Sequence, residues 1–387
     1  MKKVGIICEY NPFHTGHLHQ IGLAKKEDTA VICLMSGNLT QRGELAITDK
    51  YTRAACALAS GADLVIELPF PFCSSSADYF AGAGVAILDA LGVNEINFGS
   101  ESADAEGLLS LAQVTASAEF DQSVKEKLKT DPTLGAAQAY FEAMKDVGEK
   151  KELLSNDMLG LAYFRAALRI GCENKLSVIK RDGADYNSKS AQEKTHPSAR
   201  AVREMLRSGN MKALDLMPGS AAEIFSKAPL SDIKNLTSAI LSFFRLADPD
   251  KLSEFSESGG GLSHRLCTAA KEARTLEEFF EKAAAKRYTD SRVRRAVLNC
   301  MIGVTETDLC TPPAYVQLLA ANSVGRGLLS EIKKGSPLPV VTKPADAAAI
   351  SARQAELSAR ADALYTLAFD EPFCAAEYVK RSPFIDF

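Results

Sequence analysis

The chain has 387 residues, with 45 Lys and Arg against 49 Asp and Glu, so its formal net charge is −4. Its 46% apolar and 24% charged residues are typical of a folded globular protein and exclude a largely disordered chain. The small negative charge also excludes a uniformly basic nucleic-acid coat protein, although it allows a local basic patch.

Through the first 205 residues, short apolar runs alternate with longer segments of helical spacing. The apolar runs are Val4–Cys8, Ala30–Met35, Leu64–Leu68, Ile96–Phe98 and Leu176–Ile179. The helical segments are Leu18–Lys26, Asp49–Ser60, Ala77–Leu91, Ala105–Lys129 and Met158–Ile170. Short continuous apolar runs joined by helices are typical of a parallel sheet covered on both faces. The sequence therefore predicts a doubly wound, Rossmann-like α/β domain with five parallel strands over residues 1–205.

From residue 206 onward the pattern changes, because strand-like runs become scarce. The helical candidates are Ser231–Leu246, Thr275–Ala285, Asp290–Val304, Ala314–Ala321 and Ala345–Phe369. We therefore expect a second, mainly helical domain over residues 206–387. Within residues 338–342, the pair Val340-Val341 predicts a late strand that returns to the first domain.

The sequence carries no signal for a membrane or a structural metal site. No apolar run reaches the roughly 18 residues of a membrane-spanning helix. The run Val4–Cys8 is also too short for the core of a signal peptide, so we expect a cytosolic protein with no membrane partner. The nine cysteines form no Cys-x-x-Cys pair, and we expect neither disulfides nor a metal site.

The strongest chemical signal is His14-Thr15-Gly16-His17, which lies between the first predicted strand and a helix. Backbone N–H groups at a helix N-terminus attract anions, and Gly16 lets a phosphate approach the backbone closely. The imidazoles of His14 and His17 can both donate to oxygens of that phosphate, on which charge grows when a nucleophile attacks the phosphorus. The motif predicts a phosphate site with two catalytic histidines, whereas His19 should face another way on the helix.

A second pattern, Ser198-Ala199-Arg200-Ala201-Val202-Arg203, follows the last predicted strand of the first domain. Together, the two motifs resemble the signatures of the nucleotidyltransferase superfamily, which is related to class I aminoacyl-tRNA synthetases. Ser198 can cap a helix while it reaches a phosphate, and Arg203 can bind the β- and γ-phosphates and the leaving pyrophosphate. The alternative is a Ser-capped helix on the surface.

Longer motifs resemble the bacterial tRNA(Met) cytidine acetate ligases over nearly the whole chain. They cover residues 5–18, 35–44, 61–69, 98–101, 155–160, 180–186, 286–295 and 338–343. The resemblance implies that ATP and acetate form acetyl-adenylate and pyrophosphate. The N4 atom of the wobble cytidine of elongator tRNA(Met) then takes the acetyl group, which gives N4-acetylcytidine and AMP.

The resemblance also implies which residues contact ATP. These are Ile7, Cys8, Glu9, Tyr10, Asn11, Pro12, Phe13, His14, Thr15, Gly16, His17, Leu18, His19 and Gln20, with Gly99, Asn156 and Arg181. The catalytic residues would be His14, His17, Ser198 and Arg203. Simpler roles are a turn for Gly99, a helix cap for Asn156 and a solvated surface position for Arg181. Mg²⁺ would arrive with ATP, because no metal-ligand cluster is visible.

The run Lys286–Arg295 contains five cationic residues and one acidic residue, Asp290. The five are Lys286, Arg287, Arg292, Arg294 and Arg295. A basic stripe beside an aromatic residue such as Tyr288 suits contacts with a phosphate backbone, and with the resemblance it predicts the tRNA-binding site. The alternative is a solvated, charged helix face.

A polar cluster after the second predicted strand allows two interpretations. Its members are Gln41, Arg42, Glu44, Asp49, Lys50 and Arg53. In one interpretation Asp49 caps the following helix and pairs with Arg53, four residues on. In the other, Arg42 and Lys50 handle acetate or the tRNA.

Two other functions share part of this evidence. A small-molecule adenylyltransferase that makes a dinucleotide cofactor precursor would use the same two phosphate motifs. A non-catalytic tRNA-binding protein would need only the basic run.

Overall fold

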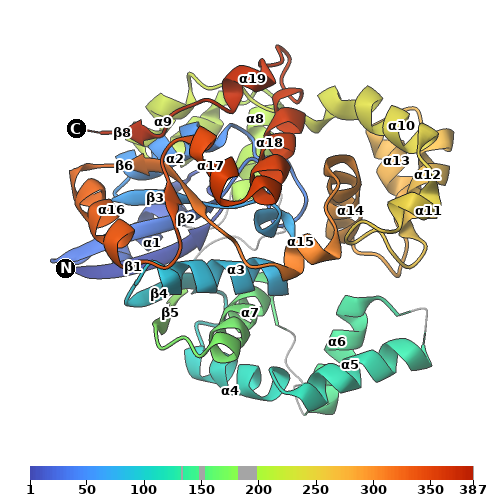
Figure 1. Cartoon of the computed structure of the whole chain (residues 1–387), viewed down its shortest axis with the longest axis horizontal. Coiled ribbons are helices and arrows are strands. Elements are labelled where there is room, and N and C mark those ends of the chain that lie inside the picture. The colour runs from blue at the N-terminus through green and yellow to red at the C-terminus, as the bar shows by residue number, and fades with distance from the viewer. Residues whose placement is uncertain (132–133, 148–152, 182–197, 387) are drawn as a thin grey trace.

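The computed structural model describes residues 1–131, 134–147, 153–181 and 198–386, and within these residues one mixed sheet forms the centre of the molecule (Figure 1). Its strand order is β5-β4-β1-β2-β3-β6-β7, and β8 also pairs with β6. The strands are β1 (Lys2–Cys8), β2 (Thr29–Ser36), β3 (Leu64–Leu68), β4 (Glu95–Ser100), β5 (Lys175–Lys180), β6 (Val316–Ala321), β7 (Val340–Val341) and β8 (Phe384–Ile385).

The five predicted strands are all present and run parallel, which confirms the doubly wound α/β prediction. Successive strands β1, β2 and β3 are added toward one edge of the sheet, and β4 and β5 toward the other. The order therefore reverses between β1 and β4. In open parallel sheets, ligands bind outside the carboxyl ends of the strands at such a reversal. The loops after Cys8 and Ser100 are thus the expected walls of a site.

Helices cover both faces of the sheet, and a further group extends to one side of it (Figure 1). In the first part of the chain they are α1 (Thr15–Ala24), α2 (Lys50–Ala59), α3 (Ala77–Ala90), α4 (Ala105–Thr115), α5 (Ala118–Thr130), α6 (Ala136–Asp146), α7 (Ser155–Ile170), α8 (Ala199–Arg207) and α9 (Gly219–Phe225). The later helices are α10 (Thr237–Leu246), α11 (Pro249–Leu252), α12 (Leu262–Glu272), α13 (Leu276–Ala283), α14 (Asp290–Ile302), α15 (Glu306–Cys310), α16 (Ser323–Gly335), α17 (Pro344–Ile350), α18 (Ala352–Thr366) and α19 (Ala375–Tyr378).

The alternation of side chains along β1 assigns residues to the two faces of the sheet. Val4 and Ile6 belong to a buried cluster that includes Ile21 of α1 and residues of α2, α8 and α9. Ile7 belongs to the opposite cluster, with Phe80 of α3 and residues of α7. Both faces are covered, which explains why the strands are apolar throughout rather than alternating.

Three predicted helices differ from the structure. Residues 314–321 were predicted to be helical, but residues 316–321 form β6, which pairs antiparallel with β3. A short apolar run does not distinguish a buried helix from a buried strand, and here the open edge of β3 decides the outcome. Residues 105–129 form two helices because Ser117 caps α5, and residues 345–369 divide at Ser351, which caps α18. The predicted late strand at Val340–Val341 is confirmed and pairs with β6.

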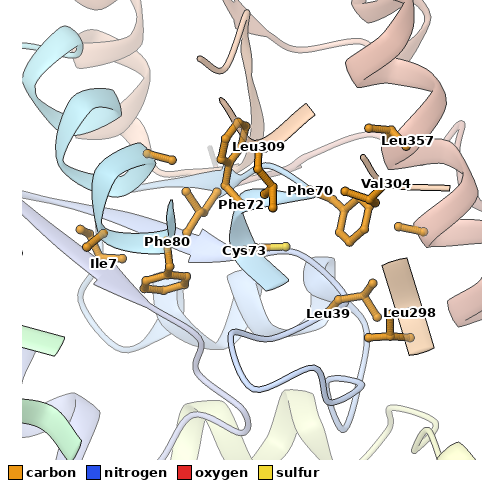
Figure 2. Close-up of a cluster of buried hydrophobic side chains, with 14 of the residues drawn as sticks. Ile7, Leu39, Phe70, Phe72, Cys73, Phe80, Leu298, Val304, Leu309 and Leu357 are labelled. Carbon is orange, nitrogen blue, oxygen red and sulfur yellow. The ribbon is translucent and has the colours of Figure 1, made fainter. Parts of the chain in front are cut away.

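The apolar core joins the two halves of the chain. In the cluster drawn in Figure 2, Leu39, Phe70 and Phe72 come from loops near β2 and β3. Their neighbours there are Leu298, Val304, Leu309 and Leu357, from α14, α18 and the segment between them. Because these residues are nearly inaccessible to water, the C-terminal helices are part of the same core as the sheet.

A buried ion cluster ties α18 to the sheet. The ammonium group of Lys50 lies 2.9 Å from carboxylate oxygens of both Glu67 and Asp362. Burial opposes the charge of Lys50, but the two carboxylates outweigh it and raise the pKa of Lys50 well above its ordinary value. Lys50, the first residue of α2, is therefore a buried structural cation. This buried pairing favours a structural role for Lys50, and a role of Arg42 and Lys50 in handling acetate or the tRNA stays a prediction.

Replacing Lys50 by Met should destabilise the fold by about 3–5 kcal/mol, because Glu67 and Asp362 would then face each other without a cation. The measurement is the free energy of unfolding from urea denaturation. Lys234→Met is the matched control, because Lys234 forms an exposed ion pair with Glu277 and should contribute less than about 1 kcal/mol. Equal effects of the two substitutions would contradict a structural role for the buried cluster.

Candidate active site

The carboxyl ends of β1 and β2 are held together by Arg53 of α2. Asp49 caps this helix, as one interpretation predicted, because its carboxylate accepts from the N–H groups of Tyr51 and Thr52. The predicted pair between Asp49 and Arg53 is wrong, since the buried guanidinium instead donates to backbone carbonyls. Its acceptors are the carbonyl oxygens of Glu9, Ser36, Gly37 and Thr48. The loops that follow both strands are thereby fixed in position.

His14 caps α1, which begins at Thr15, three residues earlier than the sequence pattern placed its start. Its Nδ1 accepts from the N–H of Gly16 at 3.0 Å, so His14 is the cap of the helix. In return the N–H of His14 donates to Nδ1 of His17 at 3.2 Å. Because a backbone N–H occupies each Nδ1, the proton of each neutral ring is on Nε2. The two rings stack with centroids 3.8 Å apart.

His17 is held in its neutral form. Burial lowers the pKa of His17 well below its ordinary value, and the neighbouring His14 and Arg181 lower it further. Tyr10 and Phe13 pack against its ring, with centroids 4.8 and 5.5 Å away. At neutral pH His17 therefore offers an Nε2–H donor in a fixed orientation.

A cavity of about 510 Å³ lies at this edge of the sheet, and we call it the strand-end cavity. Thirteen of the predicted ATP-contacting or catalytic residues line it, although they come from segments nearly 200 residues apart. They are Ile7, Cys8, Glu9, Tyr10, Asn11, His14, His17, Gln20, Gly99, Asn156, Arg181, Ser198 and Arg203.

The remaining predicted contacts lie outside the lining of this cavity. They are Pro12, Phe13, Thr15, Gly16, Leu18 and His19. Phe13 is a buried core residue that supports Tyr10 and His17, whereas Leu18 and His19 are exposed on α1. The N–H of Gly16 is already bound to His14. An apparently continuous contact segment therefore divides into residues that face the cavity and residues that support it.

Gly99, Asn156 and Arg181 form one wall of the cavity. A side chain at Gly99 would lie 3.0 Å from Cγ of Arg181, so the bare backbone leaves room for that arginine. Arg181 donates to the side-chain oxygen of Asn156 at 3.2 Å. Asn156 does not cap α7, because Glu101 accepts from the N–H groups of Asn156 and Asp157 and takes that role. The amide of Asn156 is thus held between Glu101 and Arg181.

Ser198 and Arg203 of the second motif also line the cavity. Ser198 caps α8, since its hydroxyl accepts from the N–H of Ala201. Arg203 is almost fully buried and donates to the carbonyl of Asn11 at 2.7 Å and to Glu44 at 2.9 Å. Burial opposes the charge of Glu44, but Arg203 and Arg294 together lower its pKa. A charged Glu44 therefore holds Arg203 beside the loop that carries the histidines.

The five predicted tRNA-binding cations do not form one exposed stripe. Lys286 and Arg287 are exposed, in the turn before α14. Arg294 pairs with Glu44 at 2.7 Å. The other two cations share one carboxylate, that of Glu257. Arg295 is buried and pairs with Glu257 at 2.9 Å, and Arg292 lies 3.8 Å from it. On a helix, residues 292 and 295 share a face that packs inward, whereas the preceding turn stays in solvent.

Several residues that shape the site had no role assigned from the sequence, although Gln41 and Glu44 belong to the polar cluster and Glu101 to a longer motif. Glu44 bridges α8 and α14, and Glu101 caps α7, yet both acids occur in polar loops with many other candidates. Gln41 links Glu9 to Arg295, because its N–H donates to Glu9 and its carbonyl accepts from Arg295. These contacts join distant segments, so only the folded chain reveals them.

Within the described residues, no three His, Cys, Asp or Glu side chains are grouped so that they could hold a metal ion. The same part of the chain contains no helix with the length and apolar character needed to cross a bilayer. The motif segment 182–186 lies outside the described residues.

Comparison with known proteins gives a consistent result along the whole chain. Residues 1–378 match the family model described as HIGH Nucleotidyl Transferase. The tRNA(Met) cytidine acetate ligase of Acetivibrio thermocellus is 35% identical over 96% of each chain. The enzyme of the same name from Thermotoga maritima is 36% identical over 86% of this chain and 85% of its own length.

Solved structures agree with these matches. Apo Thermotoga maritima TmcAL superposes with a TM-score of 0.91 at 30% identity, and the same protein bound to α-thio ATP superposes with 0.89 at 29% identity; both alignments cover 100% of each chain. The sequence motifs, the fold and the strand-end cavity thus have the same explanation: the chain belongs to the tRNA(Met) cytidine acetate ligase family of HIGH nucleotidyl transferases.

Proposed function

We propose that this protein is an ATP-dependent acetate ligase that forms N4-acetylcytidine at the wobble position of elongator tRNA(Met) through an acetyl-adenylate. The observation that carries the proposal is the meeting of His14, His17 and Arg203 around one cavity at the reversal of the strand order. The names of the relatives and the α-thio ATP bound to a similar structure support the same substrates. A tRNA substrate would place the reaction in the cytoplasm.

In the first step, an oxygen of acetate attacks the α-phosphorus of ATP. The bond from that phosphorus to pyrophosphate breaks, which leaves acetyl-adenylate. The Nε2–H groups of His14 and His17 would donate to the α-phosphate oxygens, where charge develops in the transition state. Arg203 lies near the N-terminus of α8, which Ser198 caps, and would bind the leaving pyrophosphate. Fixed donors need no reorganisation as the reaction proceeds.

Mg²⁺ would be held chiefly by the phosphates of ATP and would neutralise part of their charge. The charged residues that line the strand-end cavity fit this arrangement, because they are arginines that suit phosphates, together with Glu9. The cations around the cavity, Arg42, Arg181 and Arg203, would supply the protein's share of the positive charge.

In the second step, N4 of the cytidine attacks the acetyl carbonyl carbon. The bond to AMP breaks, and N4 loses a proton. No acyl-enzyme is required, because the mixed anhydride already carries an activated acetyl group. Cys8 lines the cavity, but burial raises the pKa of its thiol well above the ordinary value, so it would stay protonated and unreactive.

We assign the adenylate chemistry to residues 1–205 and RNA binding to residues 206–387. The supporting observations are that the helices α10 to α14 lie beside the sheet rather than over its faces (Figure 1), and that Thr289, Ser291 and Arg295, at the N-terminal end of α14, line the strand-end cavity. Strands β6, β7 and β8 of the second part complete the sheet. The division is therefore one of function more than of folding.

The first test is an assay with ATP, radiolabelled acetate and unmodified tRNA(Met). Label should reach a cytidine, and His17→Ala should reduce the rate by about 10²–10³-fold, because a fixed donor to the α-phosphate is lost. The exposed His19→Ala is the matched control and should be near wild type. Transfer of AMP to a small phosphate ester, without label on tRNA, would instead indicate an adenylyltransferase. Absence of any ATP turnover would indicate a tRNA-binding protein.

The role of Arg203 can be separated from the general charge of α8. Arg203→Ala should reduce acetyl-adenylate formation by about 10²-fold or more, because the phosphates lose a buried guanidinium. Arg200→Ala on the same helix removes a half-exposed arginine paired with Glu204 and should have little effect. The measurement is acetate-dependent ATP–pyrophosphate exchange, with melting temperatures to confirm folding. Equal losses in both variants would contradict a phosphate-binding role for Arg203.

The protonation state of His17 gives a prediction that does not depend on activity. Its pKa is lowered, so the folded protein should keep His17 neutral as the pH falls from 8 to 6.5 and protonate it only at lower pH. Nitrogen NMR should show protonated Nε2 and unprotonated Nδ1 at pH 7. The signal is assigned by its loss in His17→Gln. A titration midpoint at or above 6.5 would overturn this description of the donor.

A further inference from the structure

A groove of about 1020 Å³ opens between the α5–α6 hairpin and the N-terminal end of α14. One side is formed by the hairpin, by the first turn of α3 and by Met158, Ala162 and Arg165 of α7. The other is formed by the turn at Lys286 and Arg287 and by α14. At Gly135 the hairpin meets that turn closely, because a Cβ there would lie 2.5 Å from the carbonyl oxygen of Arg287. We call this space the outer groove.

The outer groove adjoins the strand-end cavity. Six residues line both spaces, and we call them the mouth: Gln41, Ala77, Phe141, Met158, Thr289 and Arg295. Three of these side chains are apolar or aromatic, and the other three carry hydrogen-bonding groups. An opening with both kinds of group suits a flat ring with a polar edge, such as a nucleobase.

Phe141 is the unusual member of the mouth. It lies on α6, and 39% of its surface is exposed, although it is a large aromatic residue. The apolar side of this helix is already used, since Ala139, Ala143 and Met144 are buried. Phe141 is therefore not part of the core packing of the helix. An exposed ring between a basic groove and a reaction cavity is the kind of surface on which an unpaired base stacks.

The charges of the groove favour a polyanion. Arg165 is neutralised by Asp78 and Asp121, and Arg292 and Arg295 meet Glu257. Among the described residues, four exposed cations of the groove take part in no ion pair. They are Lys125, Lys145, Lys286 and Arg287, and they come from both sides of the groove. The remaining acids are Glu142 and Glu306, and Glu306 keeps its charge while it accepts hydrogen bonds from Tyr79 and Ser256. The lining as a whole has seven cationic and five acidic residues, so its balance is positive.

We propose that the outer groove binds a single-stranded RNA loop and that the target cytidine enters the strand-end cavity through the mouth, stacked on Phe141. This inference rests on the proposed function, adds the route of the RNA, and extends the RNA contacts from residues 206–387 to the α5–α6 hairpin. The exposed cations would contact phosphates on both sides of the loop. Gln41, Thr289 and Arg295 would face the polar edge of the base. N4 would then enter the cavity in which the acetyl-adenylate forms.

The test compares Phe141→Ala, Phe141→Leu and Phe141→Trp with Phe384→Ala. Phe384 is the matched control, because it is similarly exposed but lies on β8, outside the groove. The first readout is the affinity for an RNA stem-loop with a cytidine in its loop, measured by fluorescence anisotropy. Ala and Leu should weaken binding by about tenfold, whereas Trp should restore it, because stacking needs an aromatic ring. The control should bind like wild type.

The second readout is acetate-dependent ATP–pyrophosphate exchange, which needs no RNA. It should be unchanged in Phe141→Ala. A raised KM for ATP in that variant would overturn the proposal, since Phe141 would then contact ATP. Wild-type RNA affinity in Phe141→Ala would overturn it as well.

A third readout places the base directly. An RNA loop with 5-iodocytidine forms a covalent bond to an adjacent aromatic ring on irradiation, and mass spectrometry of the wild-type protein should locate it at Phe141. A crosslink only outside the mouth would overturn the proposal. Crosslinking at Phe141 in a protein that makes no acetyl-adenylate would support the RNA groove and refute the ligase function, so the two failures are distinguishable.

Discussion

The arrangement of the site depends on one buried guanidinium. Arg53 donates to carbonyl oxygens after β1, after β2 and before α2, and it does so with almost no exposure to water. Carbonyls at the ends of parallel strands have no ladder partner, so leaving them buried without a donor would be costly. Arg53 satisfies them and fixes the loop that leads to His14 relative to the loop that leads to Glu44. The orientation of the histidines and of Arg203 follows from this arrangement.

The strands and helix caps that depend only on residues close in the sequence were predictable. The five parallel strands are short apolar runs, and Asp49 and Ser198 are good caps directly before amphipathic helices. The histidine motif could be placed because it follows such a strand. Its detailed geometry could not, since sequence spacing does not reveal that His14 and His17 bond reciprocally through Nδ1 and backbone N–H groups.

Contacts between distant segments were not predictable. Residues 316–321 became a strand because β3 had an open edge, which no local pattern records. Glu44 meets Arg294 across 250 residues of sequence, so the loop after β2 and the first turns of α14 share one ion network with Arg203. The predicted basic stripe is divided for a related reason: Glu257, in a loop without a motif, pairs with two of its arginines and holds them inward.

The position of β6 has a consequence for how the protein is made. The edge of β3 is completed only by a strand about 250 residues further along the chain. At the usual rate of synthesis, roughly 5–20 residues per second, the ribosome needs on the order of 12–50 s to supply it. During that time the nascent sheet has an unpaired edge on a strand that is apolar at four of its five positions. Such an edge pairs readily with other chains, so the interval before β6 is synthesised is the stage at which an unprotected nascent chain is most prone to aggregate.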